Sequence, residues 1–297
     1  MTVARLEGGA WRAAAPVPVG EVARLLPGLA AGGAPVALGL DLPLGLPRDY
    51  ARHRPEPDFP AFLRGLAARP EFFAVSATLD TVTRDRPFYP ARGVRGMTRA
   101  AHAAALGLDG PHGLSRLCDR ATAERPAGAP VFWTLGANQS GKAAIAAWRD
   151  WLLPAFAEGL PVALWPFDGG LRALLAPGRA VLAEVYPAEA LRQCGLRLGG
   201  SKRSQAPRRA LAPALLAAMA ARRVQPSPAL AAAVADGFGT DAAGEDRFDS
   251  VIGLLGLVGV LDGARPDFVP DDPWIRRWEG WVLGQTSLPL RGVDPTM

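Results

Sequence analysis

The amino-acid sequence predicts an α/β fold in which a mixed sheet is flanked by helices, and two observations support this. Three short apolar runs, at residues 35–41, 161–165 and 179–186, have the length and continuity of buried parallel strands. Helical segments are expected over residues 142–158 and 207–223, between and after these runs. Strands that alternate with helices in this way are typical of a layered α/β domain.

The N-terminal residues predict a hairpin followed by the first buried strand. Residues 2–18 form two short extended runs around the turn pair Gly8 and Gly9. A short helix is expected next, over residues 21–31. The first apolar run then places Asp41 at the carboxyl end of a parallel strand.

We expect a single domain covering residues 1–297. Its core comprises about residues 1–48 and 129–263. Residues 49–128, rich in Arg, Pro and His, form a mostly helical and loop insertion at one edge of the sheet, and residues 264–297 form a C-terminal extension.

The last long helix is predicted over residues 245–261. In it Gly253, Gly256 and Gly259 recur every three residues, which would let the helix approach a neighbouring element closely.

Composition excludes several classes of protein. With 297 residues, 49% of them hydrophobic, the chain can bury a sizeable core, and two cysteines and three histidines build neither a disulfide framework nor a zinc site. The net charge of +5 would suit a polyanionic partner, yet all but two of the 33 basic residues are arginines, which also fits a GC-rich coding sequence. The longest apolar run, Val251 to Leu261, is too short to span a bilayer. We expect a cytoplasmic protein without a membrane partner, and leave its oligomeric state open.

Carboxylates follow the predicted strands. Asp41, Asp168 and Glu184 end apolar runs, and ligands of open α/β sheets bind outside the carboxyl ends of the strands. Asp246 and Asp249 lie three residues apart on one face of a helix. Oxygen ligands without a His or Cys cluster point to Mg²⁺ or Mn²⁺. Taken singly, each acid also fits a turn or helix cap.

Several motifs in the chain share an order and spacing with a known family. The first three are Leu38-Gly-Leu-Asp41-Leu-Pro-Leu-Gly-Leu-Pro47, Ala183-Glu184-Val-Tyr-Pro187 and Asp246-Arg-Phe-Asp249-Ser-Val-Ile-Gly. Three more are Phe132-Trp-Thr-Leu-Gly-Ala-Asn-Gln139, Trp165-Pro-Phe-Asp168 and Glu279-Gly-Trp281. Together they resemble the family called domain of unknown function 429, described as predicted nucleases with an RNase H fold. The resemblance spans about residues 35–285.

The resemblance implies an RNase H-like mixed sheet and a two-metal nuclease site. Asp41, Glu184, Asp246 and Asp249 would be both the catalytic residues and the ligands of Mg²⁺ (or Mn²⁺), which activates water and stabilises the leaving oxygen. An RNase H fold begins with a central strand that ends in an acid, whereas this sequence opens on the hairpin. We therefore expect either a start codon assigned one strand too late, which we favour, or a sheet that lacks its first central strand.

Two basic segments are candidates for substrate binding. Gly136-Ala-Asn-Gln-Ser-Gly-Lys142 matches a phosphate-binding loop except at its last position, where Ala143 replaces Ser or Thr. The second segment is the basic patch around residues 201–209. The residues we expect to contact substrate are Lys142, Asn138, Gln139, Lys202 and Arg203.

The sequence thus predicts a Mg²⁺-dependent nuclease that hydrolyses phosphodiester bonds, with nucleic acid as the candidate partner. Two alternatives stay open. The chain is a non-catalytic nucleic-acid- or nucleotide-binding protein, since the first acid is missing, or an ATP-using enzyme that works through the loop from Gly136 to Lys142. Whether the chain is an enzyme at all is left open by the sequence.

Overall fold

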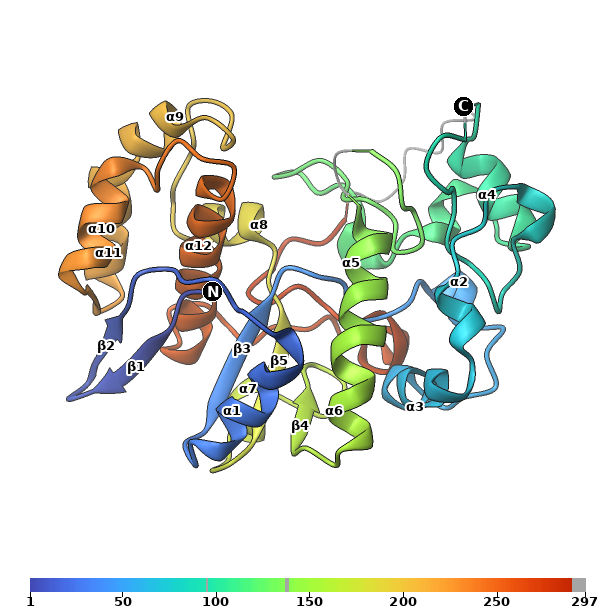
Figure 1. The fold of residues 1–297 in the computed structure, drawn as a ribbon, viewed down its shortest axis with the longest axis horizontal. Helices are drawn as coiled ribbons and strands as arrows, with labels where there is room; N and C mark the ends of the chain where they lie inside the picture. Colours follow the sequence, from blue (N-terminus) through green and yellow to red (C-terminus); the bar gives the residue numbers. More distant parts are fainter. Residues whose placement is uncertain (95, 137–138, 290–297) are drawn as a thin grey trace.

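The structure is a computed structural model that describes residues 1–297 except 95, 137–138 and 290–297. Its described residues form a mixed α/β fold with two three-stranded sheets (Figure 1). The hairpin sheet has the order β1-β2-β6, with β1 antiparallel and β6 parallel to β2. The other sheet is parallel throughout and has the order β3-β5-β4. The strands are β1 (Ala4–Glu7), β2 (Ala10–Ala13), β3 (Val36–Leu40), β4 (Val162–Leu164), β5 (Ala180–Glu184) and β6 (Val224–Pro226).

Twelve α-helices lie in the described part of the chain. They are α1 (Leu25–Ala31), α2 (Arg48–Ala51), α3 (Phe59–Gly65), α4 (Arg99–Ala105), α5 (Ser140–Ala147), α6 (Leu153–Ala157), α7 (Leu171–Leu174), α8 (Pro187–Gln193), α9 (Gln205–Ala210), α10 (Ala212–Ala221), α11 (Pro228–Asp236) and α12 (Gly244–Leu261). None of these helices combines the length and apolar character needed to cross a bilayer.

The α/β class and the parallel strands agree with the sequence prediction, but the prediction of one mixed sheet is wrong for the described residues. The three apolar runs do form parallel neighbours, with β5 between β3 and β4. The hairpin instead forms a separate sheet, because no described strand hydrogen-bonds to both β1 and β3. Within the described residues, the outer edge of β3 is therefore unpaired.

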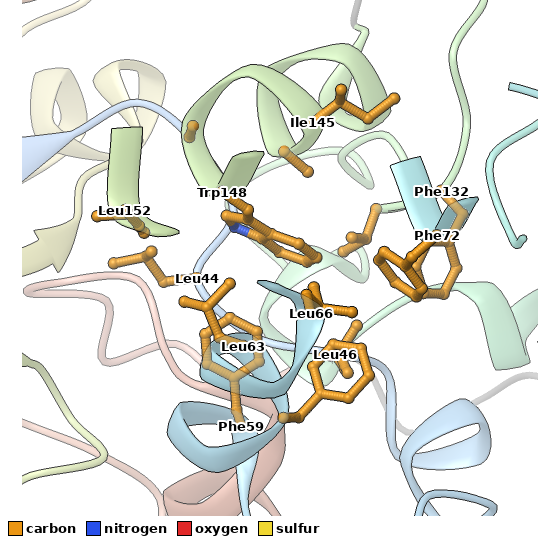
Figure 2. Packing of buried hydrophobic residues seen from close by; sticks show 14 of the residues in the cluster. Leu44, Leu46, Phe59, Leu63, Leu66, Phe72, Phe132, Ile145, Trp148 and Leu152 are labelled. Carbon is orange, nitrogen blue, oxygen red and sulfur yellow. The ribbon is translucent and has the colours of Figure 1, made fainter. Parts of the chain in front are cut away.

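The central strand β5 separates two hydrophobic clusters. Its side chains alternate, so that Ala180 and Leu182 join one cluster while Val181 and Ala183 join the other. The first cluster includes Trp148 and aromatic residues of the predicted insertion, such as Phe59 and Phe72 (Figure 2). The second cluster lies between the sheet and helices α8, α10, α11 and α12. Residues 49–128 thus pack directly on the sheet through a shared core.

Helix α12 joins the two sheets. It packs against β3 and α8, and Ser250 and Asp262 contact the N-terminal segment that forms the hairpin. There the hydroxyls of Thr2 and Ser250 are 2.7 Å apart, and the Trp11 indole donates to Asp262 at 3.0 Å. The bounds of α12 agree with the predicted helix 245–261 to within one residue at its start.

One expectation for the segments around the sheet is wrong, because Asp168 does not end a strand. Residues 131–135 also form no strand and make only an isolated bridge from Trp133 to Tyr89. Strand β4 ends at Leu164, and Asp168 instead accepts a hydrogen bond from the Leu164 amide at 2.7 Å. Asp168 closes a turn, as the capping interpretation had it.

Candidate functional site

A cleft among the described residues opens at the carboxyl ends of β3 and β5, where ligands of parallel sheets bind. Its volume is about 430 Å³. The polar residues that line it are Asp41, Arg116, Asp119, Arg125, Gln139, Ser140, Glu184, Tyr186 and Lys202. The cleft is thus lined by the ends of two strands, the start of α5 and two loops.

Asp41 is the residue that directly follows β3, and its side chain is exposed to the cleft. It makes no side-chain hydrogen bond to another described residue. Partial dehydration within the cleft, reinforced by the nearby negative charge of Asp249, Glu184 and Asp246, raises the pKa of Asp41 to about 7. Lys202 acts in the opposite direction. Asp41 can therefore take up or release a proton near neutral pH.

Glu184, at the end of β5, is buried and fully engaged by Arg116. The Arg116 Nη1 and Nη2 atoms lie 2.6 and 2.7 Å from the two Glu184 carboxylate oxygens, and the Leu44 amide donates to the same carboxylate at 2.8 Å. Burial raises the pKa of Glu184, and Arg116 opposes this rise. The Glu184 carboxylate and the Arg116 guanidinium thus form a buried, bidentate ion pair.

Arg116 is itself only 1% exposed and bridges two acids. Besides Glu184, it donates to both oxygens of Asp119, from Nε at 2.9 Å and from Nη2 at 2.8 Å. It also donates to the Leu44 carbonyl at 3.2 Å. Two carboxylates and a carbonyl thus satisfy a buried guanidinium.

Asp249 of α12 is engaged by Lys202. The Lys202 Nζ atom lies 2.5 Å from an Asp249 oxygen and 3.2 Å from a Glu245 oxygen. Burial raises the pKa of Asp249, and the Lys202 ammonium opposes this rise. Asp246 is exposed and lies close enough to the Met1 amino group to interact with its charge.

The four acids predicted as metal ligands are thus within electrostatic reach of one another, but they do not form a metal site as arranged. No group of three His, Cys, Asp or Glu side chains in the described ranges could hold an ion. Arg116 binds both oxygens of Glu184, and Lys202 binds one oxygen of Asp249. Within the described residues, Asp41 and Asp246 make no ion pair or side-chain hydrogen bond, and of these two only Asp41 lines the cleft.

The predicted substrate-binding residues divide between the cleft and its surroundings. Gln139 and Lys202 line the cleft, and Arg203 lies beside Lys202 with its side chain 71% exposed. Lys142 is exposed and is not among the cleft-lining residues. Asn138 lies outside the described residues. The loop before α5 also lacks the preceding strand that a phosphate-binding loop requires.

Sequence reasoning missed the two buried arginines of the cleft, Arg116 and Arg125. Arg125 is 5% exposed, donates to the Gln285 side chain at 3.0 Å and lies 5.6 Å from the Tyr186 ring centroid. The available signal for Arg116 was Asp119, three residues later, which forms an ion pair with it. Nothing in the sequence linked Arg116 to Glu184, 68 residues away.

The chain matches no protein-family model, no curated protein and no solved structure.

Proposed function

We propose that the cleft hydrolyses phosphodiester bonds in nucleic acid and that the chain is a nuclease with an RNase H-like arrangement of its acids. The observation that carries the proposal is the Asp41 carboxyl, which lies in a cleft without an ion-pair partner among the described residues and has a pKa of about 7 set by burial and by other acids. A perturbed carboxyl of this kind is suited to general base catalysis near neutral pH.

The proposed reaction uses residues at the rim of the cleft to hold the phosphate. Lys202 supplies positive charge beside Asp41, Arg203 follows it in the chain with an exposed side chain, and phosphate oxygens are the groups that such side chains bind. Gln139 and Ser140, at the start of α5, add polar contacts where the helix dipole favours negative charge. A substrate phosphate is thereby placed opposite the free carboxylate.

Asp41 acts in its ionised form. It takes a proton from a water molecule as the water oxygen bonds to phosphorus, the bond to the leaving oxygen breaks, and solvent returns a proton to that oxygen. Mg²⁺ or Mn²⁺ remains the cofactor that the sequence predicts. Glu184 and Asp249 are engaged by Arg116 and Lys202, so the proposed step relies on the Asp41 carboxylate.

A cleavage assay tests the proposal. Labelled single-stranded DNA, duplex DNA, RNA and branched DNA are incubated with the wild type and with Asp41→Asn, in EDTA and with added Mg²⁺ or Mn²⁺. We expect Asp41→Asn to reduce cleavage by at least about 100-fold, the usual contribution of a general base. Asp271→Asn, which changes an exposed acid outside the cleft, is the matched control and should cleave at the wild-type rate.

Each outcome decides between hypotheses. Cleavage by Asp41→Asn at the wild-type rate contradicts the assignment of Asp41. Tight binding of nucleic acid without cleavage, under every metal condition, favours the non-catalytic alternative. Dependence on ATP favours the ATP-using alternative.

A further inference from the structure

A short segment before α9 links the cleft to α12 through ion pairs. We call residues 199–204 the strap. From it Lys202 reaches Asp249 at 2.5 Å and Glu245 at 3.2 Å, and the Arg203 Nε atom lies 3.7 Å from Glu245. Lys202 also lines the cleft that Asp41 faces. One ammonium group therefore lies among acids that come from two different elements.

A buried arginine fixes the position of the strap. Arg208, in α9, is 1% exposed and donates to the backbone carbonyl of Lys202. The same guanidinium donates to the carbonyls of Gly237 at 2.9 Å and Gly239 at 2.7 Å. Arg208 forms no ion pair with any acid in the described ranges. Burying a charge is costly, so such an arginine is expected to have an organising role.

The packing around Arg208 leaves little freedom. A Cβ atom on Gly244, the first residue of α12, would lie 2.4 Å from the Arg208 Nη2 atom. Arg208 thus contacts the strap and the segment that leads into α12 at the same time.

We propose that Lys202, positioned by Arg208, is the resident cation of the acidic cleft, standing where a divalent cation would otherwise neutralise Asp249 and its neighbours. The charged groups near Lys202 are Asp249 and Glu245 of α12, Asp41 after β3, and Arg203 beside it in the chain. The inference uses the location of the proposed active site and holds whether or not that site cleaves nucleic acid.

The composition of the chain makes the proposal easy to test, because Lys142 and Lys202 are its only lysines. Reductive methylation with ¹³C-formaldehyde keeps their charge and gives one NMR signal for each, together with the Met1 amino group. Lys202→Met and Lys142→Met assign the signals. We expect Asp249→Asn to move the Lys202 signal and to leave the Lys142 signal unchanged. Equal shifts of both signals, or no shift of either, overturn the proposal.

A second measurement asks whether Lys202 and a divalent cation compete. Mn²⁺ is titrated by calorimetry into the wild type, Lys202→Met and the control Lys142→Met. Removal of the resident cation should strengthen Mn²⁺ binding by at least about tenfold, since the acids are left without a counter-charge. Equal affinity in the wild type and Lys202→Met overturns the proposal, and a failure of cleavage assays leaves this result unaffected.

The role of Arg208 is tested with a graded pair of variants. Arg208→Lys keeps the charge and part of the carbonyl contacts, whereas Arg208→Met removes all of them. In methylated protein, the chemical shift of Lys202 should move toward the value of a solvent-exposed dimethyl-lysine in Arg208→Met. In Arg208→Lys it should move only part of the way. If Arg208→Met does not fold, Arg208→Lys alone decides, and an unchanged Lys202 signal contradicts the positioning role.

Discussion

At the scale of single residues, Asp41 makes the stability of the folded state depend on pH. Its folded-state pKa of about 7 lies above the ordinary value of 3.8, so the folded state favours the protonated form. As pH rises from about 4 to 7, the unfolded chain loses this proton first, and the stability that the protonated form contributes is lost. Ionised Asp41 is therefore a source of instability above pH 7.

Asp41→Asn should therefore raise the Tm at pH 8 and leave it nearly unchanged at pH 3.5, because the amide mimics the neutral acid. Scanning calorimetry at the two pH values measures the difference. Asp271→Asn, on an exposed site, should show no such dependence. A Tm for Asp41→Asn that falls below the wild type at pH 8 contradicts the raised pKa.

Arg116 holds two buried acids at once, and its loss should be costly. Arg116→Met leaves Glu184 and Asp119 without their cation, and uncompensated buried charge costs about 3–5 kcal/mol. Urea unfolding measures this loss in free energy. Arg149→Met is the control, because its pair with Asp150 is exposed and contributes about 0–1 kcal/mol. A loss from Arg116→Met as small as that of the control would show that the pair is not buried in solution.

At the scale of elements, the glycines of α12 are not equivalent. A Cβ atom on Gly256 would lie 2.8 Å from the Ala190 Cβ atom of α8, whereas one on Gly253 would make an ordinary 3.6 Å contact with Val185. The predicted small-residue ridge thus includes one position of close helix approach, at Gly256. Gly253 lowers the helix propensity of α12, and no neighbouring atom lies close enough to require a glycine there.

We therefore expect opposite effects from two alanine substitutions. Gly256→Ala should destabilise by about 1–3 kcal/mol, because the helices must move apart. Gly253→Ala should be neutral or stabilise by up to about 1 kcal/mol, the difference in helix propensity. Chemical unfolding of the two variants side by side tests the pair, and equal effects would contradict the close packing of α8 and α12.

The sequence predicts some of these elements and misses others for physical reasons. The runs that become β3 and β5, and the helix α12, have long apolar patterns that local propensity reinforces. Residues 131–135 are equally apolar but lie against the aromatic cluster of the insertion, where no neighbouring strand pairs with them. Burial alone therefore does not make a strand.

The candidate site was predictable only in part. Acids at strand ends placed Asp41 and Glu184 in one cleft, because parallel strands end at the same edge. The partner of Glu184 was not predictable, since the pairing with Arg116 depends on how the insertion folds over the sheet. The same contact changes the expected chemistry, because it removes Glu184 from the set of free carboxylates.

At the scale of the whole molecule, the split between the two sheets leaves an edge that exchange experiments can detect. The register of β3 with β5 directs the amides of Ala37 and Gly39 away from β5, and they have no backbone partner in the described part of the chain. Amide hydrogen exchange followed by NMR should show both exchanging faster than the amides of β5. Strong protection of Ala37 and Gly39 would indicate a partner strand in solution.

The open edge of β3 also bears on how the protein behaves at high concentration. An unpaired strand edge is a template for pairing with another chain, and β3 carries apolar side chains that are only half-buried. The exposed Val3 and Leu6, beside and within β1, add apolar surface at the hairpin sheet. We expect light scattering to show association that grows with protein concentration, and the same edge offers a place where a designed strand could be added to stabilise the protein.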